Sequence, residues 1–295
     1  MKPAAALLLM LALPAFEARA QFPSDAEPVF SGEVASGSWL RIRSLKGRIE
    51  VRETSGRTAV VTARRRFNVR PAGEISFEVK KDGSSVTVCA IWQRTTRCDE
   101  DSYESRSGND RDIGLVDFFV QLPRGVKLVA ATGNGDVTIA NAGAEVRASS
   151  GNGEVEVRGA GGAVRASSGN GDITVEGADG PVVANSGNGN IRVRTARGPV
   201  SANTGNGRID AEMAALSGDD DMEFDTGNGS ITVGFPENLS ARVEANVSYN
   251  GFRTDFPIQV PGRFSSRSVR GTIGNGSRTI RFSTGNGRVT IRKNG

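Results

Sequence analysis

Three acidic residues recur at an interval that could support catalysis. Asp136, Glu154 and Asp172 follow one another at a constant step, and each directly follows a Gly-Asn-Gly triplet. Two carboxyl groups about 5 to 9 Å apart can hydrolyse a glycosidic bond. If each 18-residue segment forms one layer of a stacked β-structure, these carboxylates lie one layer apart, near the lower limit of that range. The same column also suits polar residues that face water beside a turn, so a carbohydrate-active enzyme is our alternative hypothesis.

Clustered carboxylates could instead hold calcium. The column that follows the triplets continues as Asn190 and Arg208, which excludes a calcium-binding β-roll with an acid at every turn. Two further clusters are candidate cation sites: the run Asp219–Asp221, and the acidic residues between Asp99 and Glu104. A solvated loop is the preferred interpretation of both, so we expect no metal and no cofactor.

Composition excludes several classes of function. The chain contains no histidine, which rules out Ser-His-Asp and Cys-His nucleophile systems and His-ligated metals. Positive and negative residues alternate along the chain instead of forming the basic stripe of a nucleic-acid-binding protein. The run Arg64–Arg66 could contact an anionic polymer, but a strand end facing water explains it better. Four aromatic residues could stack on sugars or cover the ends of the fold: Trp92, Tyr103, Tyr249 and Phe252.

The N-terminus predicts export. Residues 1–20 combine a positive start, an apolar stretch and the small-residue site Ala18-Arg19-Ala20, as in a secretory signal peptide cleaved after Ala20. Residues 21–29 then form a short flexible N-terminus. No segment is apolar enough for a transmembrane helix. We expect Cys89 and Cys98 to form a disulfide in an oxidising compartment, either the periplasm or the cell surface.

A regular repeat of Gly-Asn-Gly organises the chain. The triplets recur with an 18-residue period from Gly133 to Gly205, then after a 22-residue step at Gly227, and again at Gly274 and Gly285. A repeat of this length indicates one supersecondary unit stacked on copies of itself. Glycine and asparagine suit a tight turn with positive φ. Stacked turns would align the side-chain amides in an asparagine ladder, the alternative being local turns only: Asn134, Asn152, Asn170, Asn188 and Asn206.

The segments between the triplets alternate polar and apolar residues, as in strands with one buried face. Equivalent positions hold β-branched residues in one strand and alanine in the other. We therefore predict an all-β fold, a parallel β-solenoid (β-helix or β-roll) with 18-residue coils and irregular capping strands at both ends. Its single domain spans 30–293: degenerate early coils with a disulfide loop in 30–131, regular coils in 132–233, and C-terminal coils with a cap in 234–293. An antiparallel meander is the rival fold, but it needs a second layer to cover its apolar face.

These features together resemble one bacterial family. The leader, the segments Leu122-Pro123-Arg124-Gly125 and Thr254-Asp255-Phe256-Pro257, the serial triplets and the ending Gly285-Asn286-Gly287 are similar to the exported "putative adhesin" domain-of-unknown-function family, itself similar to auto-transporter adhesin heads. The resemblance implies a β-solenoid at the bacterial surface or in the periplasm and supplies no catalytic residues. We expect a non-enzymatic structural or adhesion-type binding module whose partner is a glycan or an envelope protein. An envelope accessory protein is a third hypothesis.

Overall fold

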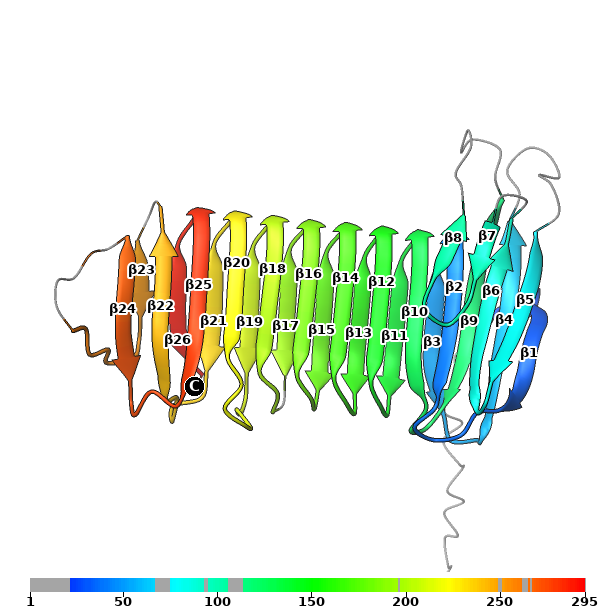
Figure 1. The fold of residues 1–295 in the computed structure, drawn as a ribbon, viewed down its shortest axis with the longest axis horizontal. Helices are drawn as coiled ribbons and strands as arrows, with labels where there is room; N and C mark the ends of the chain where they lie inside the picture. Colours follow the sequence, from blue (N-terminus) through cyan, green and yellow to red (C-terminus); the bar gives the residue numbers. More distant parts are fainter. Residues whose placement is uncertain are drawn as a thin grey trace, which may run out of the picture.

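The described part of the chain is one elongated stack of strands (Figure 1). The computed structural model describes residues 22–66, 75–92, 95–105, 114–195, 197–248, 251–261, 265 and 267–294. The predicted leader, 1–20, lies outside the described residues. Within the ranges given, no helix has the length and apolar character needed to cross a bilayer.

Two 12-stranded sheets and a short hairpin contain the described strands. Sheet A contains, in spatial order, β1 (Glu27–Glu33), β4 (Thr58–Arg66), β9 (Leu115–Pro123), β3 (Ile49–Thr54), β11 (Val137–Ala142), β13 (Val155–Ala160), β15 (Ile173–Ala178), β17 (Ile191–Thr195), β19 (Ile209–Met213), β21 (Ile231–Phe235), β26 (Val289–Lys293) and β23 (Phe252–Thr254). Sheet B contains β24 (Ser268–Ile273), β22 (Ala241–Val247), β25 (Arg278–Asn286), β20 (Met222–Asn228), β18 (Val200–Asn206), β16 (Val182–Asn188), β14 (Val164–Asn170), β12 (Val146–Asn152), β10 (Lys127–Asn134), β2 (Trp39–Lys46), β6 (Ser85–Ile91) and β5 (Ser76–Asp82). The hairpin consists of β7 (Thr95–Cys98) and β8 (Tyr103–Ser105).

Each regular coil contributes one strand to each sheet. From β10 to β21 the chain alternates between the sheets, and every strand pairs in parallel with its equivalent in the next coil. Val155 pairs with Ile173, and Ile173 with Ile191, so like residues meet along the axis. The prediction of a parallel β-solenoid is confirmed, and the antiparallel meander was the wrong alternative for these coils.

The core is a thin apolar layer between the sheets. In β14 the burial alternates along the strand, and in β15 Ile173 and Val175 are both fully buried. Sheet A supplies mostly valine and isoleucine, while sheet B supplies valine and alanine. Burying one such β-branched side chain contributes about 1.5 to 3 kcal/mol, so each coil adds to the stability by covering its neighbours.

The Gly-Asn-Gly turn connects the two strands of a coil and must pack against its copies. A Cβ on Gly169 would lie 2.4 Å from the carbonyl oxygen of Gly151 in the preceding coil. Gly171 has φ +158°, and a Cβ there would lie 2.1 Å from the oxygen of Gly153. Neither distance is compatible with a side chain, so the axial spacing of the coils explains both glycines of the triplet.

The N-terminal end is capped by a long excursion of the chain. Strands β2 and β3 form a first coil, which pairs in parallel with β10 and β11. Between β3 and β10 the chain builds β4 to β9. Strands β4, β5, β6 and β9 lie beyond this coil and include the antiparallel pairs β4–β9 and β5–β6, while β7 and β8 form the separate hairpin. Strands β6 and β9 continue the parallel stack beside β2 and β3, whereas β4 and β5 pair antiparallel with β9 and β6. The subdivision of residues 30–293 stays a prediction. Strand β1 begins at Glu27, inside the segment 21–29 for which we expected a flexible N-terminus.

The C-terminal end repeats this arrangement. Strands β25 and β26 stack directly on β20 and β21, while β22 to β24, which precede them in the chain, lie farther out. Strand β24 pairs antiparallel with β22. At both ends, therefore, antiparallel or very short strands terminate the parallel stack, which protects its open edges from pairing with other chains.

Candidate functional site: columns and outer faces

The acidic column braces neighbouring coils. The Asp136 carboxylate accepts a hydrogen bond from the backbone N–H of Glu154 at 2.9 Å. Asp172 accepts one from the N–H of Asn190 at 2.7 Å, and Asn190 Oδ1 accepts one from the N–H of Arg208 at 3.0 Å. Because an amide performs the same task as a carboxylate, this column needs an acceptor and not a charge. The three acids are exposed, and Asp136 and Asp172 act as acceptors for the backbone of the next coil.

The asparagines of the triplets lie in one column. In each step the Nδ2 amide of one asparagine donates to Oδ1 of the asparagine in the preceding coil, for example from Asn152 to Asn134 at 2.8 Å. The column joins seven asparagines: Asn134, Asn152, Asn170, Asn188, Asn206, Asn228 and Asn286. Asn275 belongs to the triplet at Gly274 but lies in a different turn, where its backbone N–H donates to Ser240.

A second column of hydroxyls lies just inside the first. The Ser168 hydroxyl donates to the carbonyl oxygen of Gly153, in the turn of the preceding coil, at 2.9 Å. The residue before each triplet of the stack makes the same bond: Thr132, Ser150, Ser168, Ser186, Thr204, Thr226 and Thr284. We did not foresee this column, although a Ser or Thr precedes every triplet except the one at Gly274 and was a visible signal.

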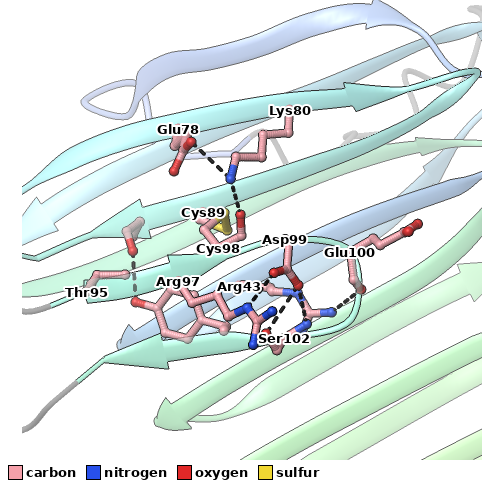
Figure 2. The surroundings of a disulfide bond; sticks show 12 residues. Arg43, Glu78, Lys80, Cys89, Thr95, Arg97, Cys98, Asp99, Glu100 and Ser102 are labelled. Carbon is pink, nitrogen blue, oxygen red and sulfur yellow. Dashed lines mark hydrogen bonds and ion pairs between the residues drawn. A yellow bond between two sulfur atoms is a disulfide. The ribbon is translucent and has the colours of Figure 1, made fainter.

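The disulfide fastens the β7–β8 hairpin to the outer face of sheet B. Cys89 in β6 is bonded to Cys98 at the end of β7 (Figure 2). The Asp99 carboxylate accepts hydrogen bonds from the Ser102 N–H at 2.7 Å and from the Arg97 side chain at 2.8 Å. The Ser102 backbone bond, opposed by desolvation and assisted by Arg97, lowers the pKa of Asp99 to about 2. The acidic residues of this loop thus order the loop itself.

The β7–β8 hairpin also covers basic residues of β2. Arg43 donates to the backbone carbonyl of Glu100, and the Arg41 guanidinium lies 3.4 Å from the Glu100 carboxylate (Figure 2 labels Arg43 and Glu100). Burial is the main cause that lowers the pKa of Arg43 from its ordinary value. Burial also raises the pKa of Tyr103 to about 12, and its hydroxyl donates to the carbonyl of Ala90.

The acidic run Asp219–Asp221 is neutralised by arginines of β25. Asp221 accepts a hydrogen bond from the backbone N–H of Thr279 at 2.8 Å and lies 3.6 Å from the Arg281 guanidinium. Arg278 is largely buried and lies 4.0 Å from Asp219. Among the described residues no three or more His, Cys, Asp or Glu side chains gather where they could hold a metal ion. The insertion that lengthens this step of the repeat therefore docks against the last coil.

The arginine run at the end of β4 has a buried partner. Asp117 of β9 is fully buried, and the guanidiniums of Arg64 and Arg66 lie 3.4 and 2.9 Å from its carboxylate. Arg48 also contributes, through its backbone N–H at 3.2 Å. Arg65 points the other way and pairs with Glu27 at 2.8 Å. This network closes the N-terminal cap.

Trp92 and Phe252, two of the four aromatic residues that we singled out, lie near the ends of the stack. Trp92 is buried, and its indole N–H donates to the carbonyl of Gly114. Phe252 packs against the core, and Tyr249 lies outside the described residues. Trp39, which the sequence did not highlight, lies on the outer face of sheet B. Cations of three residues lie within 6.0 Å of the centre of its ring: Arg41, Lys127 and Arg147.

The two outer faces carry charge differently. On sheet A, outward acids and arginines alternate along the axis: the Glu176 carboxylate lies 3.9 Å from Arg158 and 3.7 Å from Arg194, and Arg194 lies 3.4 Å from Glu212. On sheet B, the strands β10, β12, β14, β16 and β18 contain Lys127, Arg147 and Arg165 and no acidic residue. Sheet A neutralises its own charges, whereas sheet B presents an excess of positive charge.

The geometry therefore defines an extended β-solenoid in which Asp136 and Asp172 accept hydrogen bonds from the backbone of the next coil. The chain belongs to the Toastrack DUF4097 family, whose model matches residues 116–292. It is similar to solved structures described as a putative cell adhesion protein from Clostridium sporogenes ATCC 15579 (12% identity, 91% of this chain and 100% of that chain, TM-score 0.27) and a putative adhesin from Bacteroides fragilis NCTC 9343 (12%, 92% and 98%, 0.42). A third is a putative adhesin from Parabacteroides distasonis ATCC 8503 (11%, 92% and 98%, 0.37). No curated protein matched.

Proposed function

We propose that this chain is an exported, non-enzymatic β-solenoid that serves as a structural or adhesion-type binding module at the bacterial envelope. The observation that carries this proposal is the use of Asp136 and Asp172 as hydrogen-bond acceptors for the next coil. Two of the three carboxylates spaced for glycoside hydrolysis thus join neighbouring coils. What remains is a rigid body with two long polar faces, a form suited to binding along its length.

Two features support export. Residues 1–20 have the pattern of a secretory leader. The Cys89–Cys98 bond belongs to the kind that persists in oxidising compartments. In such a compartment the two long polar faces would meet the components of the envelope, and a glycan or an envelope protein is the partner that we propose.

The proposal is tested in two steps. Cells that express the tagged full chain are fractionated, and the mature protein is used to retain material from envelope extracts. We expect a chain shortened by the leader in the envelope or exported fractions, and retention of a glycan or protein. A cytoplasmic chain of full length, or no retained material, would contradict the proposal.

The enzyme hypothesis needs its own measurement. Reducing-end assays on a panel of acidic and neutral glycans should give no sustained turnover by the wild-type protein. Turnover that disappears in Asp172→Asn would replace the binding module with a carbohydrate-active enzyme, because Asn at this position keeps the structural hydrogen bond, as Asn190 does.

A further inference from the structure

A shallow groove runs along the outer face of sheet B. It has a volume of about 210 Å³ and crosses the strands from β10 to β16. Its polar lining consists of two guanidiniums, two hydroxyls and one amide: Arg147, Arg165, Ser149, Ser167 and Asn185. Val129 pairs with Arg147, and Val183 pairs with Arg165, so these two half-buried valines flank the two arginines along the axis. None of the residues that line the groove is acidic.

The two arginines are in register but differ in their partners. Arg147 pairs directly with Arg165 in the neighbouring strand, so their Cα atoms are separated by one strand spacing of about 4.8 Å. Arg147 is held by the Glu145 carboxylate, at 3.0 Å from Nε and 2.9 Å from Nη2, and its guanidinium lies 4.6 Å from the centre of the Trp39 ring. Arg165 is exposed and makes no ion pair within the residues that the structure describes.

This arrangement leaves guanidinium N–H donors that an anion in the groove could use. A guanidinium has five N–H donors, and Arg147 uses two of them on Glu145. Glu145 offsets the charge of Arg147, so Arg165 supplies most of the positive charge open to an anion, and Arg147 adds its remaining N–H donors. Guanidiniums recognise carboxylates in two-pronged geometry. The groove therefore has a charge complementary to a carboxylate-bearing ligand.

The groove is shaped for a chain and not for a small ion. The hydroxyl and amide column beside the arginines continues along the axis from Ser149 to Asn203, where Asn203 donates to Asn185 at 3.3 Å. Hydroxyls and amides both donate and accept, as sugar hydroxyls require. Towards the N-terminal end, Arg43 of the same column is covered by the β7–β8 hairpin, where it donates to the Glu100 carbonyl.

We propose that this groove binds a linear anionic polysaccharide with carboxylates on successive sugars, lying along the solenoid axis. Arg147 and Arg165 bind the carboxylates, Ser149, Ser167 and Asn185 bind hydroxyls, and the half-exposed valines contact the sugar rings. This assignment rests on the proposed binding function and names its ligand class and its site.

Polygalacturonate is a suitable carboxylated probe, and dextran is the neutral control, both titrated calorimetrically into the mature protein. Arg165→Gln should weaken polygalacturonate binding about tenfold, the loss expected for one charge-assisted contact. Arg192→Gln on sheet A removes the same charge from an exposed position outside the groove and should leave binding within twofold. Ser167→Glu, which places a carboxylate in the groove, should abolish binding, while Thr174→Glu on sheet A should not.

Other results would overturn the assignment. These are no binding of polygalacturonate by the wild type, equal losses in Arg165→Gln and Arg192→Gln, or equal affinity for dextran. Displacement by single-stranded DNA of equal charge would also overturn it, because the face would then be a general polyanion surface. Retention of envelope material that Arg165→Gln does not change would refute this site and leave the proposed function standing. Loss of all retention in the wild type would refute the function itself.

Discussion

At the scale of single residues, Ser168 illustrates how adjacent coils are joined. Its hydroxyl is buried and donates to the Gly153 carbonyl at 2.9 Å. Ser168→Ala leaves that buried acceptor without its side-chain donor, so we expect the free energy of unfolding to fall by about 1 to 3 kcal/mol. Denaturant titration followed by circular dichroism measures this change as a lower transition midpoint at an unchanged slope.

The neighbouring serine provides the matched control. Ser167 faces water on the outer side of sheet B, and Ser167→Ala should change the free energy of unfolding by less than about 0.5 kcal/mol. Equal losses in the two variants would mean that the hydroxyl column does not stabilise the stack.

Asp99 predicts a local dependence on pH. Its pKa in the folded protein is about 2, below the ordinary value of 3.8, mainly because the Ser102 N–H donates to its charged form. The stabilising contribution is therefore present above about pH 4 and is lost as the pH falls towards 2. Amide exchange of Ser102, corrected for intrinsic rates, should accelerate across this window. In Asp99→Asn that acceleration should be absent, and an unchanged profile would show that the carboxylate does not order the loop.

Sequence reasoning at this scale was strongest where a residue type recurred. The fixed interval of Asn152 and Asn170 predicted that these amides would share a column, because the interval fixes the register. Ser168 was overlooked because a small polar residue beside a turn is ordinary in loops, and burial alone distinguishes it from Ser167. Asp117 and its arginines were beyond prediction, since their pairing joins strands far apart in the sequence.

At the scale of elements, the stack depends on inward residues of each strand. Ile173 is fully buried between Val155 and Ile191 in sheet A. Ile173→Asp would place an unpaired carboxylate in the apolar layer, and we expect a loss of more than about 4 kcal/mol in the free energy of unfolding. Thermal melting should show a protein that is unfolded or has a severely lowered midpoint.

Thr174 is the control for the same strand. It faces outward between Glu156 and Arg192, so Thr174→Asp adds a charge that water can solvate. We expect melting close to that of the wild type. Normal melting of Ile173→Asp would instead refute the assignment of this strand.

The regular elements were predictable and the capping elements were not. Between 132 and 233, the alternation of residues and the fixed period specify which face of each strand is buried and which strands are neighbours. Strands β4–β6, β9 and β22–β24 lack that period, and each group lies farther out along the axis than the coils that precede and follow it in the sequence. Such non-local pairing leaves no periodic pattern in the sequence: β25 pairs with β20 although β21 to β24 lie between them in the chain.

At the scale of the whole molecule, the solenoid is a sum of coils and their contacts. Each strand of the regular part pairs with equivalent strands on both sides, in the same register. The stability of such a stack is approximately the sum of coil terms and nearest-neighbour terms. Removing one complete coil should therefore leave a folded protein with one fewer layer.

Deletion of residues 151–168 removes one complete coil, from the start of one triplet to the residue before the next. It joins Ser150 to Gly169, so that Asn170 takes the place of Asn152 beside Asn134 and the hydroxyl and asparagine columns stay continuous. We expect the variant to keep its strand content by circular dichroism and to unfold cooperatively with lower stability. Small-angle scattering should show a particle shorter by about 4.8 Å, the spacing of one strand.

Deletion of residues 151–159 is the control for this prediction, because it removes half a coil. The residues that follow would then enter the wrong sheet. Asn170 would lie outside the asparagine column, and the glycines of its turn would pack against side chains instead of other glycines. We expect this variant not to fold, although it loses a shorter segment. If it folded as well as the full-coil deletion, stability would not depend on the register between coils. If the full-coil deletion also failed to fold, the regular coils would not be equivalent.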